Sequence, residues 1–198
     1  LFLRWNPSTT MKCAIFEENG NHHDMQRVLG HVTLQNAVRR MGDFVLTSCA
    51  ANALQPYRQN DNGWDQGQVF FTPSQVWGMP PYYAQQMAAA HHRPLTVGCG
   101  VEGADGVLDV TATRSREAGS VVLHIANTGA EPLRVGLRVD GMGKVSQARM
   151  VSLSGDLDAV NTPEEPRRIA PVGRELPAWA AQTVDIAPYS YTIVVLDE

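Results

Sequence analysis

Residues 12–50 read KCAIFEENGNHHDMQRVLGHVTLQNAVRRMGDFVLTSCA and contain two apolar runs on either side of an amphipathic segment. The runs from Lys12 to Phe16 and from Asp43 to Ala50 have the composition of buried strands. Between them, apolar residues recur at helical spacing from Met25 to Met41, and a glycine follows as a helix stop. A buried strand, a helix and a second buried strand predict a parallel α/β unit.

The next segment is polar and contains few structural signals. Residues from Asn52 to Thr72 are rich in Asn, Gln, Asp and Gly, which predicts a long loop. Loops of about 20 residues in compact domains are usually functional or disordered, and we interpret this one as functional. A short helix is expected from Pro73 to Trp77 and a second from Pro81 to about His91, because Pro suits the first turn of a helix.

Beyond residue 94 the helical pattern ends and short runs with period-two alternation follow one another. In one of them Val121, Leu123 and Ile125 alternate with Val122, His124 and Ala126, so the two sets should face opposite sides of a sheet. Several such strands in succession predict an antiparallel β-sandwich. The Pro-rich stretch from Asn161 to Trp179 is expected to be a surface loop within it.

Bulk composition weighs against several classes of protein. The 198 residues have a net charge of −4 and no run of Lys or Arg, which argues against a nucleic-acid partner. No apolar run approaches the ~18 residues that a membrane helix needs. The three cysteines, Cys13, Cys49 and Cys99, are expected to be buried free thiols. Because the chain starts LFLRWNPSTTM without an initiating Met, we expect it to be a piece of a longer protein.

The adjacent glutamates Glu17 and Glu18 end the first apolar run. They are either a solvated strand end or part of a catalytic site. Successive side chains on an extended strand point to opposite sides, so the two carboxylates cannot form a catalytic pair with each other. If one of them is catalytic, its partner must come from elsewhere.

Three motifs carry a family resemblance: IFEENG at residues 15–20, the helical segment at 25–43, and NDNGWDQGQVFFTPSQVWGMPPYYAQQM at 60–87. Together they resemble the C-terminal region of α-L-arabinofuranosidases of glycoside hydrolase family 51. The resemblance is strongest from Ala14 to Met87. In the predicted sandwich only the strand pattern and its position match.

The resemblance implies a fold of two classes, α/β plus all-β. Residues 1–93 would be the C-terminal part of a catalytic (β/α)₈ TIM barrel, namely its seventh and eighth units. Residues 94–198 would form an antiparallel β-sandwich of jelly-roll type. The first six barrel units would lie outside this chain.

The resemblance also implies site residues. The family's nucleophile is a Glu at the end of the seventh barrel strand, which falls on Glu18, with Glu17 as the alternative. Glu17 and Asn19 depart from the family pattern around this position, which keeps the alternative open. Gln66 and Trp64 match the family's substrate-binding Trp-x-Gln segment. The alternative is that Gln66 is a loop residue that contacts only water. The acid/base Glu of the family follows an Asn on the fourth strand and has no counterpart here.

We expect no metal and no cofactor. His22 and His23 are adjacent, as are His91 and His92, and adjacent residues do not converge on one ion. His22 or His23 at the rim of the site is a further hypothesis.

The resemblance therefore implies part of a retaining α-L-arabinofuranosidase that hydrolyses terminal non-reducing α-L-arabinofuranosyl residues of polysaccharides and oligosaccharides. The chain alone should be inactive because it lacks the acid/base. The alternative is a non-catalytic carbohydrate-binding or structural β-sandwich module. Partners would be arabinofuranosyl glycans, with no nucleic acid and no membrane, and the whole enzyme would be a homo-oligomer. We predict a cytoplasmic location, with secretion left open.

Overall fold

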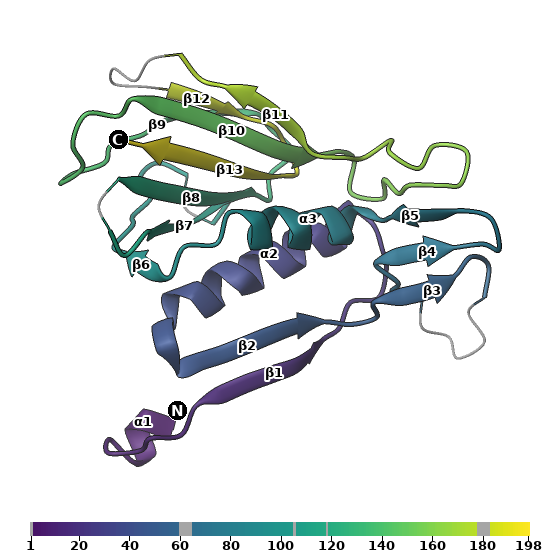
Figure 1. Cartoon of the computed structure of the whole chain (residues 1–198), viewed down its shortest axis with the longest axis horizontal. Helices are drawn as coiled ribbons and strands as arrows, with labels where there is room; N and C mark the ends of the chain where they lie inside the picture. Colours follow the sequence, from purple (N-terminus) through teal and green to yellow (C-terminus); the bar gives the residue numbers. More distant parts are fainter. Residues whose placement is uncertain (1, 60–64, 105, 118, 178–182) are drawn as a thin grey trace.

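The computed structural model describes residues 2–59, 65–104, 106–117, 119–177 and 183–198. The fold is mostly β-sheet with few helices, and a layer of two helices separates a sandwich from a pair of parallel strands (Figure 1). The elements before the sandwich are α1 Phe2–Trp5, β1 Cys13–Glu18, α2 Met25–Arg40, the 3₁₀ turn η1 Gly42–Phe44, β2 Val45–Ala50, β3 Leu54–Pro56, β4 Val69–Phe71, β5 Val76–Gly78 and α3 Pro80–Ala90. Those of the sandwich are β6 Leu95–Val97, β7 Leu108–Arg114, β8 Ser120–Asn127, β9 Leu133–Gly136, β10 Gln147–Ser154, β11 Val172–Glu175, β12 Thr183–Ile186 and β13 Ser190–Asp197.

The predicted parallel α/β unit is confirmed. Strands β1 and β2 pair in parallel and α2 connects them, with Ile15 opposite Ser48 and Glu18 opposite Ala50. The side chain of Asp24 caps α2 by accepting a hydrogen bond from the backbone N–H of Arg27 at 3.0 Å. The sequence therefore places the loop after β1 directly at the N-terminus of α2.

Burial of both strands, however, was predicted wrongly. Phe16 on β1 is 79% exposed and Leu46 on β2 is 68% exposed. The pair of strands has α2 on one side, and none of the described residues forms a second layer on the other (Figure 1). An apolar strand is buried on both faces only when both faces are covered.

The polar segment after β2 contains strands as well as loop. β3 pairs in parallel with β4, and β4 pairs antiparallel with β5. The prediction of a helix from Pro73 to Trp77 is wrong, because Val76 and Trp77 belong to β5. Phe70 of β4 lies opposite Trp77 of β5, and both are buried. This cross-strand aromatic pair stabilises a hairpin in place of the helix. The second helix is confirmed as α3, with Pro80 in its first turn.

The predicted antiparallel sandwich is confirmed. One sheet has six strands in the order β11-β10-β13-β8-β7-β6, and the other has β12 and β9. Val122 and Ala126 of β8 pack in a core with α2 and α3, whereas Leu123 and Ile125 pack in a second core with β9 and β12. The alternation in the sequence therefore assigned the two faces of β8 correctly.

Two smaller predictions are corrected. The stretch from Asn161 to Trp179 contains β11, which pairs with β10, and buries Asn161 and Ile169. Its last two residues lie outside the described part of the chain. The cysteines are free, but Cys49 and Cys99 are exposed and Cys13 is half-buried, because β2 has an uncovered face and Cys99 lies in a loop. The domain boundary after residue 93 stays a prediction.

Candidate functional site

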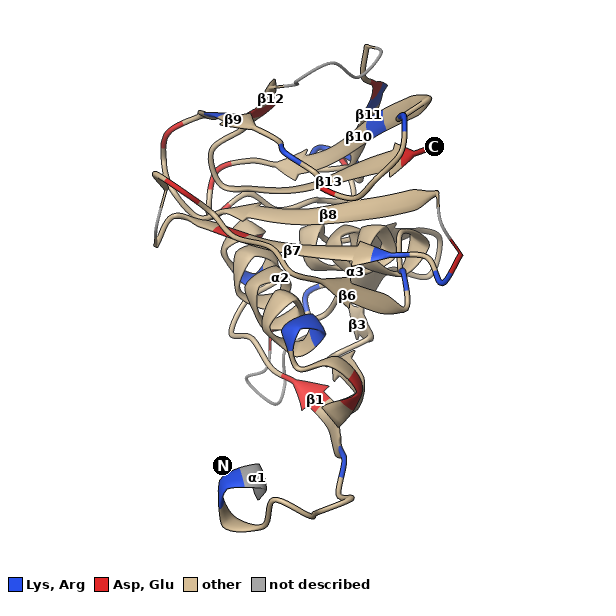
Figure 2. Ribbon diagram, turned by 90° about the vertical axis from the view of Figure 1, so that its left-hand side faces the viewer, with Lys and Arg blue, Asp and Glu red and all other residues tan. Residues whose placement is uncertain are grey.

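Glu18 lies at the C-terminal end of β1 and is 4% exposed, whereas its neighbour Glu17 is exposed. The pairing of β1 with β2 is irregular between Ile15 and Glu18, so the difference between the two glutamates rests on their burial. Figure 2 shows acidic residues on β1, and the basic residues in that view are scattered over several elements. The structure therefore separates the two glutamates: one is enclosed and the other faces outward.

Two neighbouring elements hold the carboxylate of Glu18. The Nδ1 atom of His31, on α2, lies 3.0 Å from Glu18 Oε2. The hydroxyl of Ser48, on β2, donates a hydrogen bond to Glu18 Oε1. Both oxygens of the carboxylate are thus fixed by side chains from the same α/β unit.

Arg27 contacts His31 on the side away from Glu18 and connects several segments of the chain. Its Nε donates to His31 Nε2 at 2.7 Å, and its Nη1 donates to the carbonyl of His22 at 3.0 Å. It also donates to the carbonyls of Gln66 and Ala51. Burial lowers the pKa of the Arg27 guanidinium, an effect that the negative charges of Asp24 and Glu18 oppose.

Gly20, in the loop after β1, lies against the Arg27 side chain. A Cβ atom at this position would lie 2.7 Å from Arg27 Nε. A residue with a Cβ atom at this position would therefore force the Arg27 side chain to shift.

Gln66 contacts the two residues that follow Glu18. It is 4% exposed, its Oε1 accepts a hydrogen bond from the Gly20 backbone N–H at 3.1 Å, and its Nε2 donates to Asn19 Oδ1 at 3.3 Å. Gln55 holds the loop in place, because its Oε1 accepts from the Gly67 backbone N–H at 2.8 Å. Trp64, the other predicted substrate contact, lies outside the described residues.

The histidines of the loop differ in their surroundings. His23 packs against Phe70, with ring centroids 4.8 Å apart, and its Nδ1 lies 3.3 Å from Asp65 Oδ1. His22 is exposed. Across the residues that the structure describes, no group of three or more His, Cys, Asp or Glu side chains could hold a metal ion. Nor is any described helix long and apolar enough to cross a membrane.

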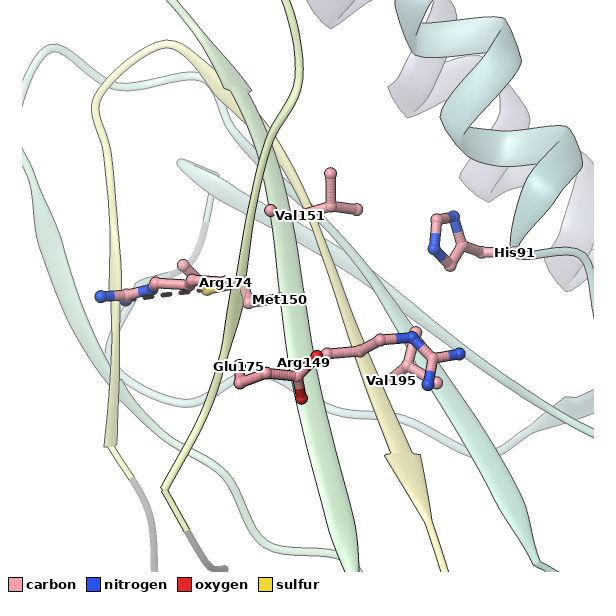
Figure 3. Close-up of a pocket in the computed structure, with 8 residues that line it drawn as sticks. His91, Arg149, Met150, Val151, Arg174, Glu175 and Val195 are labelled. Atoms are coloured by element: carbon pink, nitrogen blue, oxygen red, sulfur yellow. Dashed lines mark hydrogen bonds between the residues drawn. The ribbon is translucent and has the colours of Figure 1, made fainter.

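Two hollows lie on the sandwich and contain none of these residues. The smaller, of about 300 Å³, is lined by His91 of α3 and by residues of β10, β11 and β13. Figure 3 shows Arg149 and Val151 on the side of the strands that faces His91, and Arg174 on the other side. The larger, of about 1230 Å³, lies between β7, β8 and the segment from Leu133 to Met142.

Sequence reasoning missed Arg27, His31 and Ser48 as parts of the site. It assigned the apolar stripe of α2 to the core, which is correct for Val28 and Val32. The available signal was the spacing of Arg27 and His31, four residues apart and therefore on one face of the helix. Their contact with Glu18 depends on how α2 packs against β1.

Comparisons with known proteins relate the chain to one family. A family model described as the α-L-arabinofuranosidase C-terminal domain matches residues 8–190. No curated protein sequence matches the chain.

Several solved structures share the fold. An arabinose-bound MgGH51 α-L-arabinofuranosidase is 21% identical with a TM-score of 0.80, over 89% of this chain and 28% of that one. The α-L-arabinofuranosidase from Thermotoga maritima in complex with arabinose is 19% identical with a TM-score of 0.79, over 94% of this chain and 43% of that one. The GH51 arabinofuranosidase from Xanthomonas axonopodis pv. citri is 12% identical with a TM-score of 0.73, over 98% and 43%. The chain thus spans less than half the length of these structures.

Proposed function

The chain belongs to the α-L-arabinofuranosidase C-terminal domain family, and on this premise we propose that it is part of a retaining α-L-arabinofuranosidase. The whole enzyme would hydrolyse terminal non-reducing α-L-arabinofuranosyl residues of polysaccharides and oligosaccharides. The observation that carries this proposal is the enclosed carboxylate of Glu18 at the C-terminal end of a strand, held by His31 and Ser48. In TIM barrels the C-terminal ends of the strands form the active site.

We assign β1 and β2 to the seventh and eighth strands of a TIM barrel, with α2 and α3 as the helices that follow them. The exposed apolar side chains Phe16 and Leu46 support this assignment. In a complete barrel, strands are buried on both faces and their inward side chains fill the interior. The first six units of the barrel would supply the missing cover.

In the proposed reaction, Glu18 attacks the anomeric carbon of the arabinofuranosyl group. The bond from this carbon to the leaving oxygen breaks, and the leaving oxygen takes a proton from a second carboxyl group about 5–5.5 Å from the first. That acid is a Glu on the fourth barrel strand, outside this chain. The same Glu then removes a proton from water, which hydrolyses the arabinosyl ester of Glu18 and restores both residues.

Gln66 and Trp64 are the proposed contacts to the sugar. Gln66 touches the residues that follow Glu18, and an amide can donate and accept hydrogen bonds at once, as sugar hydroxyls require. The cytoplasmic location and the homo-oligomeric state of the whole enzyme stay predictions.

Activity on an aryl α-L-arabinofuranoside tests the proposal. The whole enzyme, with all eight barrel units, is expected to release the phenol and to form the α-anomer of arabinose first, as observed by NMR. This 198-residue chain is expected to release none, because it lacks the acid/base. Equal rates from both proteins, or a first product of inverted configuration, would contradict the proposed mechanism.

A further inference from the structure

We propose that Arg27 and His31 are positioning residues that act in sequence on Glu18: Arg27 fixes the tautomer of His31, and His31 then orients the Glu18 carboxylate. This inference rests on the proposed role of Glu18 as nucleophile. It concerns two side chains of α2 that sequence reasoning did not connect with the site.

The first step is the contact between Arg27 and His31. Arg27 Nε lies 2.7 Å from His31 Nε2, and the guanidinium has donors and no acceptor. His31 Nε2 must therefore accept this hydrogen bond and cannot carry a proton. A neutral imidazole with a bare Nε2 has its proton on Nδ1.

The second step is the contact between His31 and Glu18. His31 Nδ1 lies 3.0 Å from Glu18 Oε2, and both side chains are almost fully buried. With the proton on Nδ1, His31 donates to the carboxylate. The opposite tautomer would place two acceptors against each other at this distance, which is costly in a buried site.

Arg27 is itself held firmly enough to set the tautomer. It donates to the carbonyls of His22, Gln66 and Ala51, which belong to three different segments around the site. The loop passes against the guanidinium at Gly20, where a side chain would collide with it. Arg27 therefore links the orientation of the nucleophile with the loop that carries Gln66.

This arrangement suits a nucleophile. Because the donor to Glu18 Oε2 is a neutral imidazole, the carboxylate is oriented while its negative charge is not cancelled by a direct ion pair. The positive charge of Arg27 is one side chain further away, on the far side of the His31 ring. Each carboxylate oxygen keeps a lone pair for attack on the sugar.

The tautomer can be measured directly in the protein labelled with ¹⁵N in its histidines. The His31 ring, assigned by comparison with His31→Gln, is expected to show a protonated Nδ1 and a bare Nε2. A protonated Nε2 in the wild-type protein would overturn the proposal. This measurement needs no catalysis, so it tests the inference even if the proposed function fails.

Kinetics of the whole enzyme provide the second test. His31→Leu is expected to lower kcat by about 10- to 100-fold, the range for one hydrogen bond to a charged group, with KM within about threefold of wild type. His31→Asn, whose amide nitrogen can occupy the position of Nδ1, is expected to recover most of the lost kcat. Equal losses in His31→Leu and His31→Asn would reduce His31 to a packing residue and overturn the proposal.

Thr33→Ala is the matched control. Thr33 lies on the same helix, and its hydroxyl donates to the carbonyl of Leu29, away from Glu18. Its kcat is expected to stay within about twofold of wild type. If the enzyme is active but His31 carries its proton on Nε2, the positioning role is refuted. The proposed function is not affected by that result.

Discussion

Replacing Glu18 with alanine is expected to lower kcat of the whole enzyme on an aryl α-L-arabinofuranoside by at least about a thousandfold, or about 4 kcal/mol of activation free energy. The physical reason is that, in the proposed mechanism, the enclosed carboxylate of Glu18 forms the covalent bond to the anomeric carbon. Initial rates at saturating substrate measure the effect. Circular dichroism of the variant separates loss of catalysis from loss of fold.

Glu17→Ala is the matched control, because it removes the same group one residue earlier on the same strand. Glu17 is exposed whereas Glu18 is enclosed, so kcat is expected to stay within about threefold of wild type. A reversed result, with Glu17→Ala inactive and Glu18→Ala active, would move the nucleophile to Glu17 and refute the assignment.

The second large effect concerns stability in acid. His124 of β8 is fully buried between the sheet and the helices, and its Nδ1 lies 2.8 Å from the hydroxyl of Tyr191. Its other ring nitrogen has no hydrogen-bond partner among the described residues. Burial, with smaller contributions from the nearby Arg39, His91, His92 and Arg93, lowers the pKa of His124 from 6.5 to about 2.

The sign of the effect follows from proton binding. Between pH 6.5 and about pH 2 the unfolded chain binds a proton on His124 and the folded protein does not. The buried neutral His124 therefore does not reduce the free energy of unfolding above pH 6.5. As the pH falls below that value, the free energy of unfolding decreases. At pH 5 this group alone lowers the free energy of unfolding by about 2 kcal/mol.

Urea unfolding at pH 7, 6 and 5 measures this effect. His124→Phe, which keeps a ring at the site, is expected to flatten the dependence on pH by up to about 1.4 kcal/mol per pH unit. His22→Gln removes an exposed histidine that is not among the neighbours of His124 and is expected to leave the dependence unchanged. Equal pH dependence in the wild type and in His124→Phe would show that His124 is not the group responsible.

The parts of the fold that the sequence predicted are those encoded in local patterns. Apolar residues at helical spacing identified α2, and period-two alternation identified β8 together with the direction of Val122 and Leu123. These patterns are visible because each element places its own apolar side chains on one side. The order of strands in the six-stranded sheet is not local, and no pattern in the sequence specified it.

The errors arose where contacts between distant segments decide the structure. Pro73 suggested a helix start, but the pairing of Phe70 with Trp77 made the segment a hairpin. The exposure of Phe16 depends on which strands lie beside β1, and composition alone does not contain that information.

The candidate site was predictable in part. Strand alternation predicted that the two glutamates face different sides, and family resemblance pointed to Glu18. Its burial agrees with that choice. The contacts from His31 and Ser48 required the packing of α2 and β2 against β1, so sequence reasoning could not find them.

Azide rescue of Glu18→Ala in the whole enzyme tests most directly whether Glu18 is the nucleophile. Azide can enter the space left by the carboxylate and attack the anomeric carbon from the same side. The expected result is a rate that rises with azide concentration and a product identified by NMR as β-L-arabinofuranosyl azide. Rescue of Glu17→Ala instead, with no arabinofuranosyl azide formed by Glu18→Ala, would contradict the assignment.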